Sequence, residues 1–238
     1  MSTTLLFYKN PVLLDKQKHK NLKLKKFDHL EHAQGVNTVP VAGFEYFPCS
    51  RNHPVVFVKN SKGEFISVAL LSFTANSHNL GRQWEGVYVP SFVRRYPFVL
   101  ENSQRMVMFD ADAPHLQEDE GDALFDENGE ATSTLNDVLA FIESVEQGYK
   151  LTETYIQALN AKKLLQPFKG SIKFTDSTLK LDHLYVVDEK TFYGSLSDEE
   201  IVDWFKKGWI AWTHAHIHSI SAISEVVRRL PKQKPQPV

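Results

Sequence analysis

Two adjacent arginines, Arg94 and Arg95, offer the clearest chemistry in this sequence. They lie in the stretch GVYVPSFVRRYPFVLE, residues 86–101, where apolar residues, aromatic residues and prolines surround them. Arginine stays charged, so a guanidinium in an apolar environment needs a carboxylate, phosphate or carbonyl partner. Tyr88 and Tyr96 offer ring faces on which a guanidinium can stack. The stretch is therefore either a binding site for an anion or a charged part of the scaffold.

These two interpretations use the arginines differently. In the first, Arg94 or Arg95 binds a carboxylate or phosphate of a ligand through two parallel hydrogen bonds. In the second, one arginine is solvated and the other joins strands through an internal acid such as Glu45 or Glu101. Adjacent side chains on an extended segment point in opposite directions, so both arginines are not expected to serve one ligand. We favour the internal ion pair and keep the anion site as the alternative.

Three closely spaced histidines, His214, His216 and His218, form a second candidate. On a strand all three would share one face, whereas on a helix only the first and third could chelate a metal together. The apolar residues around them recur at steps of three and four, which favours a helix, so we predict no metal site and no cofactor. In an enzyme, Glu45, Asp188 or His216 would serve as acid or base. The candidate ligand-binding residues are Trp84, Tyr88, Arg94, Arg95, Tyr96, Glu45, Asp188 and His216.

Composition and motif content exclude several classes of protein. The chain has 238 residues and a net charge of −2, which does not recommend nucleic acid or an anionic membrane as a partner. Its one cysteine, Cys49, excludes an intrachain disulfide framework. We find no phosphate-binding loop, dinucleotide fingerprint, nucleophile elbow or zinc-protease motif. No segment approaches the roughly 18–20 apolar residues that span a bilayer, and no secretory signal is visible, so we expect a cytoplasmic protein.

Two blocks of like charge stand out. Residues 16–26 carry six lysines and no acid, and residues 110–130 carry nine acids and no lysine or arginine. Leu22 and Leu24 alternate with lysines as on a half-buried strand, so the first block is predicted to be a solvated segment and not a nucleic-acid surface. The sequence does not settle whether the positive and negative charges of the two blocks neutralise each other.

The acidic block does not have the spacing of a calcium-binding EF-hand loop. Leu124 occupies the position where the first oxygen ligand belongs. The sequence DENG, residues 126–129, instead predicts a turn with positive φ angles at Asn128 and Gly129. A divalent cation bound by the dense carboxylates is kept as the weaker alternative.

The first half of the chain is predicted to be rich in β-strands. PVVFV (54–58) and EFISVALLSF (64–73) flank a short loop that ends in glycine, as in a hairpin. FVLE (98–101) and RMVMF (105–109) predict a second hairpin. Residues 65–71 are apolar on both faces, so this strand should be covered on two sides.

The second half is predicted to begin with a long helix. We expect Thr134 with Asp137 to cap its start, Gly148 to bend it at most, and Pro167 to end it. Its core-facing stripe follows steps of three and four through Leu135, Val138, Ile142, Val145, Tyr149, Thr152, Ile156 and Leu159.

Three shorter elements follow. Residues 171–187 predict another hairpin. Ser197 and Glu200 predict a capping box at the start of a short helix that stops near Gly208. A final helix is expected over SISAISEVVRRL, residues 219–230.

These elements predict a single α+β domain over residues 1–230 and a flexible tail, rich in lysine and proline, at 231–238. A mostly antiparallel sheet from the first half should pack against the long helix and the C-terminal helices. No internal repeat and no linker between the halves is visible.

Several motifs along nearly the whole chain resemble the bacterial SapC family, the group associated with the S-layer and distinct from the permease of the same name. The most specific is W-x-x-x-Y-V-P-x-F-V-R-R-Y-P-F at residues 84–98. The others are LLFYKNPVLLD, NTVPVAGFE, HPVVFV, VALLSF, EGDALFDENGEAT, LDHLYVVDE and AH-x-x-S. The chain departs from the pattern around NSHNLGRQWEGVY, which is shorter. His214 and His218 flank the family-like His216 without belonging to the pattern.

The resemblance implies an association with bacterial cell-surface assembly, nominally the S-layer, and no reaction or catalytic residue. Genes of such proteins tend to neighbour TonB-dependent outer-membrane receptors and tryptophan-halogenase-like flavoenzymes. We therefore expect an accessory protein of a surface-layer or receptor system that binds a partner protein or an acidic ligand. The alternative is an enzyme for an amino acid, peptide or glycan, with an arginine anion site; an oligomeric structural component is a third possibility.

Overall fold

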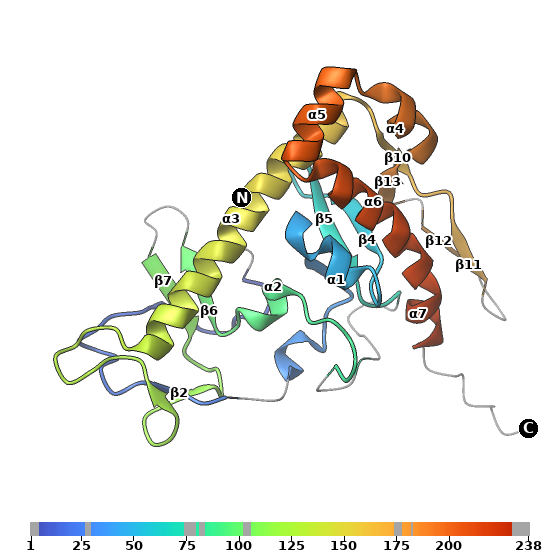
Figure 1. Ribbon diagram of the computed structural model, residues 1–238. Coiled ribbons are helices and arrows are strands. Elements are labelled where there is room, and N and C mark those ends of the chain that lie inside the picture. Colours follow the sequence, from blue (N-terminus) through green and yellow to red (C-terminus); the bar gives the residue numbers. More distant parts are fainter. Residues whose placement is uncertain are drawn as a thin grey trace, which may run out of the picture. The chain divides into compact units, whose positions relative to one another are not determined.

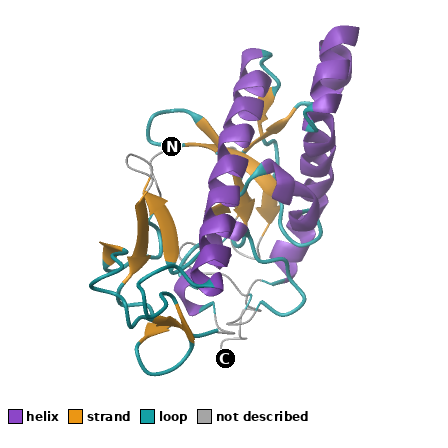
Figure 2. Cartoon of the chain, turned by 60° about the vertical axis from the view of Figure 1, so that its left-hand side comes forward, coloured by secondary structure: helices purple, strands orange, loops and turns teal. Residues whose placement is uncertain are grey.

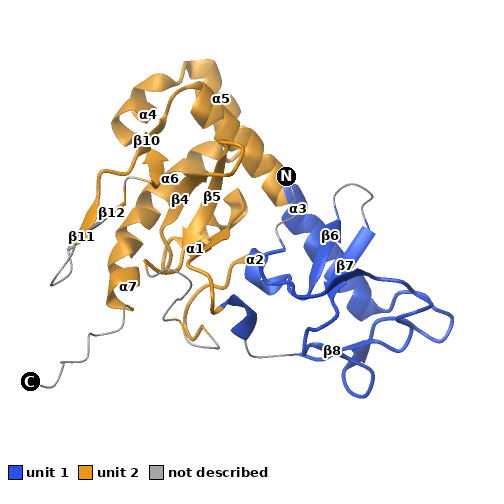
Figure 3. Cartoon of the chain, turned by 180° about the vertical axis from the view of Figure 1, so that it is seen from behind, with its two compact units in different colours: residues 1–33, 91–147 blue, residues 34–90, 148–238 orange. Residues whose placement is uncertain are grey.

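The computed structural model describes residues 5–26, 30–73, 80, 84–101, 106–173, 178–181 and 183–229. The chain forms two compact units, which Figure 3 shows in different colours. Unit 1 comprises residues 1–33 and 91–147, and unit 2 comprises residues 34–90 and 148–238. The predicted α+β class is confirmed, because antiparallel sheets are combined with a long helix and C-terminal helices. The predicted tail, residues 231–238, lies outside the described residues.

Unit 1 contains two three-stranded antiparallel sheets, two short helices and the first part of the long helix α3 (Figure 1). The first sheet has the order β1 (Pro11–Leu13), β7 (Met106–Asp110) and β6 (Phe98–Glu101). The second has the order β8 (Leu116–Gln117), β2 (Lys23–Leu24) and β9 (Asp122–Ala123). The short helices are η1 (Glu31–Ala33) and α2 (Ser91–Arg94), and α3 spans Ser133–Ala161. The pairing of β6 with β7 confirms the second predicted hairpin.

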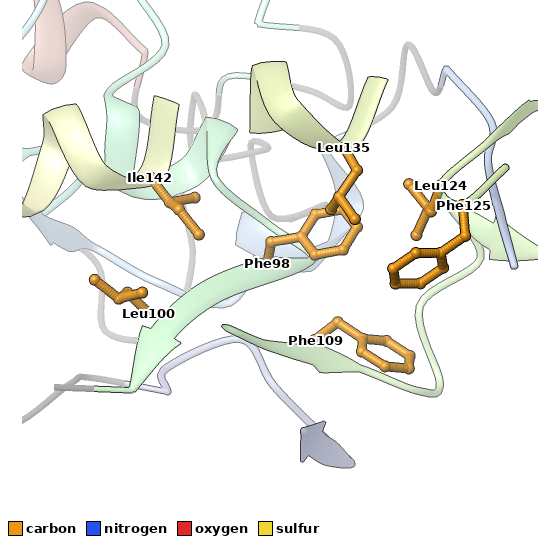
Figure 4. Close-up of a cluster of buried hydrophobic side chains, with 7 residues drawn as sticks. All are labelled: Phe98, Leu100, Phe109, Leu124, Phe125, Leu135 and Ile142. Carbon is orange, nitrogen blue, oxygen red and sulfur yellow. The ribbon is translucent and has the colours of Figure 1, made fainter. Parts of the chain in front are cut away.

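The core of unit 1 lies where its sheets meet the first part of α3. Figure 4 shows the buried cluster, which consists of Phe98, Leu100, Phe109, Leu124, Phe125, Leu135 and Ile142. Leu22 and Leu24 pack against this cluster, whereas Lys25 and Lys26 beside them are exposed and Lys23 between them is half-buried. The prediction of a half-buried strand for this lysine-rich segment is therefore confirmed.

The basic and acidic blocks of unit 1 contact each other. Strand β2 of the basic block pairs with both β8 and β9 of the acidic block. Lys25 forms an ion pair with Glu120, and Lys16 Nζ lies 3.7 Å from a carboxylate oxygen of Glu130. These pairs are exposed, so they neutralise charge without adding much stability. The question that the sequence left open is answered: the blocks do neutralise each other.

The predicted turn at residues 126–129 forms, but with a different backbone conformation. Gly129 has a φ of +77°, whereas Asn128 keeps a negative φ, so that part of the prediction was wrong. The carboxylate of Asp126 accepts hydrogen bonds from the amides of Asn128 and Glu130, each 2.9 Å long. An Asp side chain therefore organises this turn in place of a second left-handed residue.

Unit 2 is built on a five-stranded antiparallel sheet. Its strand order is β10 (Leu165–Pro167), β13 (Tyr185–Val187), β4 (Val55–Lys59), β5 (Phe65–Leu70) and β3 (Thr38–Pro40). A separate hairpin joins β11 (Ser171–Lys173) to β12 (Thr178–Lys180). The β4–β5 and β11–β12 hairpins were both predicted. Two strands from the second half of the chain complete the sheet, since residues 185–187 pair with β10 and β4 and are not part of the predicted hairpin.

The helices of unit 2 follow the local signals closely. They are η2 (Gly43–Glu45), α1 (Tyr46–Cys49), α4 (Glu189–Ser195), α5 (Asp198–Lys206), α6 (Trp209–Ser219), η3 (Ile220–Ala222) and α7 (Ile223–Arg228). The capping box of Ser197 and Glu200 is confirmed at the start of α5. Gly208, with a φ of +75°, separates α5 from α6. The three histidines lie on α6, as the apolar spacing predicted, and α6 packs against strands β4 and β13 (Figure 1). Figure 2 shows helices, in purple, beside the orange strands.

The long helix α3 has the predicted apolar stripe but not the predicted ends. Seven of the eight stripe residues are buried, and Val138 is half-buried. The hydroxyl of Thr132 accepts from the amide of Leu135, so Thr132 caps the helix and not Thr134 with Asp137. Lys163, with a φ of +55°, lies two residues after Ala161, the last residue of the helix. Pro167 lies at the end of strand β10 and therefore does not end the helix.

Candidate functional site

Arg95 is held inside unit 1 by an internal ion pair. Its Nη1 lies 3.2 Å from Oε1 of Glu146, and the two side chains are only 3% and 12% exposed. The guanidinium also lies 4.3 Å from the ring centre of Phe92. From the sequence, Glu45 or Glu101 was the expected partner. Glu146 was missed because it lies 51 residues away on a helix, where no local pattern connects it to Arg95.

Arg94 points into a different environment. The two arginines lie at the end of helix α2 and in the turn after it, not on the extended segment expected from the sequence. Arg94 is exposed, its Nη2 donates to the Ser91 hydroxyl over 2.9 Å, and its guanidinium lies 5.1 Å from the ring centre of Phe141. One arginine is thus solvated and the other is buried against an acid, as the structural interpretation requires.

Tyr96 belongs to a cluster of rings next to the arginines. It stacks on His32 with 4.2 Å between ring centres and meets His115 edge-on at 5.3 Å. Its hydroxyl donates to the buried carboxylate of Asp110 over 2.9 Å. Burial raises the pKa of the Tyr96 hydroxyl, and the hydrogen bond to Asp110 adds to this increase. Tyr96 therefore donates a proton in a fixed hydrogen bond at neutral pH.

A pocket of about 290 Å³ opens beside this cluster. Apolar side chains of Leu30, Val138 and Phe141 line it together with Arg94 and the half-buried His32. Burial lowers the pKa of His32 from 6.5 to about 4, so its ring is neutral at pH 7. Such a pocket has the features of a site for a small anion with an apolar body. It is the part of unit 1 to which the anion-site interpretation applies.

Three other candidates, Glu45, Trp84 and Tyr88, lie together in unit 2. The Tyr88 hydroxyl donates to Glu45 Oε1 over 2.9 Å, and Glu45 Oε2 accepts from the amide of Ala42 over 3.2 Å. The His53 ring nitrogen Nε2 lies 2.8 Å from the Tyr88 carbonyl oxygen, which can only accept, so this nitrogen carries the proton. The buried Trp84 ring lies 6.0 Å from the His53 ring. These residues form one hydrogen-bonded and packed group.

Asp188 has a structural position at the start of helix α4. Its carboxylate accepts from the Thr191 hydroxyl over 2.7 Å and from the Thr191 amide over 3.4 Å. The hydroxyl hydrogen bond, followed by the amide bond, lowers the pKa of Asp188. The residue is therefore an N-cap that stays ionised at neutral pH.

His216 is completely buried and joins helix α6 to the sheet of unit 2. Its Nδ1 lies 2.8 Å from the Val55 carbonyl oxygen, and the Val187 amide donates to its Nε2 over 3.0 Å. A carbonyl only accepts and an amide only donates, so the ring is neutral with the proton on Nδ1. Burial lowers the pKa of His216 from 6.5 to about 4. Both ring nitrogens are thus committed to two neighbouring strands, β4 and β13.

Ser219, three residues after His216, makes the same connection. Its hydroxyl accepts from the Val55 amide over 2.9 Å and donates to the His216 carbonyl over 2.6 Å. The motif AH-x-x-S therefore clamps helix α6 to strand β4. His214 and His218 are exposed on the same helix. Within the described ranges, no three His, Cys, Asp or Glu residues come close enough together to hold a metal ion.

The fold and these contacts define an α+β protein of two compact units, in which most of the candidate polar residues make internal contacts. No helix in the described part of the chain has the length and apolar character needed to cross a membrane. Residues 14–226 match the family model described as SapC, so the chain belongs to the SapC family. No curated protein and no solved structure was found to match the sequence.

Proposed function

We propose that this SapC-family protein is a non-catalytic accessory protein of a bacterial cell-surface system, either an S-layer or an outer-membrane receptor system. It acts in the cytoplasm by binding a partner protein. One observation carries the proposal: the three residues that an enzyme would use as acid or base, Glu45, Asp188 and His216, all serve internal contacts.

These contacts conflict with acid–base catalysis. A general base must reach the proton that it removes, within hydrogen-bonding distance of a bound substrate. Glu45 and His216 are fully buried, and His216 would have to break two backbone hydrogen bonds before it met a substrate. Asp188 is occupied by the first turn of α4. The geometry supports a scaffold role for all three residues.

Exposed apolar side chains in unit 2 support a role in binding another protein. Neighbouring large apolar side chains on a surface are typical of interaction sites, and the exposed Ile201, Val202 and Phe205 lie within five residues on α5. Phe44 precedes Phe47 by three residues, and both rings are about half exposed. Among the described residues of unit 2, the exposed large apolar ones are Phe44, Phe47, Leu151, Tyr193, Ile201, Val202, Phe205 and Val227.

The proposal is tested by native purification. The protein is tagged at its own chromosomal locus, crosslinked in growing cells, and purified for mass spectrometry, with an untagged strain as control. We expect a surface-layer or receptor-system component to co-purify from the cytoplasmic fraction, and deletion of the gene to impair that system. Recovery without such a component, together with an unaffected surface layer and receptor system, would contradict the proposal.

The second candidate is an enzyme or carrier for a small acidic molecule, and the pocket of unit 1 favours it. Arg94 and the neutral His32 both line this pocket. The test is a thermal-shift screen with amino acids, dipeptides and dicarboxylates on the wild type and the Arg94→Gln variant. A ligand that raises the melting temperature of the wild type but not of the variant would favour this candidate, and turnover of that ligand would replace the accessory role.

A further inference from the structure

A groove of about 930 Å³ opens in unit 2, and none of Glu45, Asp188 and His216 lines it. One wall is the end of helix α1 and the turn after it, with Phe47, Arg51 and Asn52. The other wall is the segment of residues 86–88, and His218 of α6 completes the lining. The walls of the groove come from three separated segments, so no local sequence pattern indicates it.

Hydrogen bonds fix both walls of the groove. The Tyr88 amide donates to Asn52 Oδ1 over 3.2 Å, which joins one wall directly to the other. The Tyr88 carbonyl accepts from His53 over 2.8 Å, and the Tyr88 hydroxyl is held by Glu45. A ligand would therefore find the groove already formed and would not have to order it, which is typical of binding sites.

The lining of the groove combines an exposed aromatic ring with positive charge. Phe47 is 57% exposed, and Arg51 and His218 are exposed beside it. Among the described residues that line the groove, no side chain is acidic. Arg229 adds a further guanidinium at the edge, where it donates to the Asn52 carbonyl over 2.8 Å. The groove is thus locally positive on a chain whose net charge is −2.

We propose that this groove binds an extended peptide segment of a protein partner, with an acidic side chain on Arg51 and an aromatic or aliphatic side chain against Phe47. Charge complementarity selects the acid, because the described lining offers the Arg51 guanidinium and hydrogen-bond donors but no carboxylate. The ring of Phe47 and the volume of the groove exceed what a small inorganic anion requires. The inference rests on the proposed function and names the surface and the chemistry of the partner.

The test begins with a random dodecapeptide library displayed on phage and panned against the full-length protein. We expect enriched peptides to place Asp or Glu next to an aromatic or aliphatic residue. The consensus peptide, made with a fluorescein label, is then titrated by fluorescence anisotropy. Its dissociation constant should rise at least tenfold in Arg51→Glu and in Phe47→Asp. Lys190→Glu on α4 and Leu6→Asp in unit 1, both at exposed positions, are the matched controls and should bind as the wild type does.

Several outcomes of these experiments would overturn the inference. The inference is overturned by the absence of enriched peptides, by a basic consensus, or by unchanged binding in Arg51→Glu with a wild-type melting temperature. It is also overturned if inorganic phosphate alone competes fully with the peptide at micromolar concentration. Native co-purification separates the two proposals. If a surface-system partner is recovered equally with the wild type and Arg51→Glu, the accessory function stands and the groove assignment fails. If the groove binds its peptide but no such partner is recovered, the accessory function fails.

Discussion

The buried His216 should make the stability of unit 2 depend on pH. In the folded protein burial lowers its pKa from 6.5 to about 4, whereas in the unfolded chain its pKa is near the ordinary value. The unfolded chain therefore binds a proton first as the pH falls. The contribution of a neutral His216 is complete above about pH 6.5 and is lost progressively as the pH falls to about 4.

The size of this effect follows from the two pKa values. Each pKa unit corresponds to roughly 1.4 kcal/mol of free energy. Between pH 7 and pH 5 the lowered pKa of His216 should remove about 2 kcal/mol of unfolding free energy. Replacement of His216 by Asn abolishes the titration. It also disturbs two buried backbone partners, the Val55 carbonyl and the Val187 amide, at a cost of about 1–3 kcal/mol each.

The assay compares the wild type with His216→Asn in urea at both pH values. Tryptophan fluorescence reports on unit 2, because all four tryptophans of the chain lie there. The variant should be less stable at pH 7, and the difference from the wild type should shrink by about 2 kcal/mol at pH 5. His214→Asn, a substitution of an exposed histidine on the same helix, should leave the pH dependence unchanged. An equal difference at both pH values would refute the assignment of a buried neutral imidazole.

Two further substitutions test the internal contacts. Arg95→Met should destabilise unit 1 by about 3–5 kcal/mol, because it leaves the buried carboxylate of Glu146 without this partner, whereas Arg94→Met should cost less than about 1 kcal/mol. Urea denaturation followed by circular dichroism measures both, and equal losses would argue against the buried pair. Gly148→Ala should fail to give the usual gain of about 1 kcal/mol for a helical position, since a Cβ there would clash with Cε1 of Phe44. The gain should return in a Phe44→Ala background, and full stabilisation in the wild type would contradict the close packing.

Sequence patterns predicted the elements whose signals are local. The stripe of α3, the β4–β5 hairpin and the capping box before α5 all depend on residues close together along the chain. Errors arose where neighbouring signals compete. Thr132 lies as close to the start of α3 as Thr134 does, and only the hydrogen bond to the Leu135 amide decides which hydroxyl caps it.

For the candidate site residues too, local requirements were predicted from the sequence, whereas partners distant in the chain were not. The sequence predicted correctly that one of the two arginines would be solvated and the other paired with an acid, because a buried guanidinium needs a partner whatever the fold. It could not select Glu146, which the winding of α3 brings to Arg95 from 51 residues away. Likewise, the residues around His216 do not predict its two backbone partners, which lie on strands β4 and β13.

The sequence by itself determined the class of fold, most of the secondary structure and the family, since hydrophobic periodicity, helix caps and motifs depend on residues close together along the chain. Only the tertiary structure decided which charges meet, which histidine is buried and where a groove opens. The physical reason is that these features depend on packing between segments far apart in the chain. Side chains become buried only when such segments pack together, and their burial sets the energy of each polar contact.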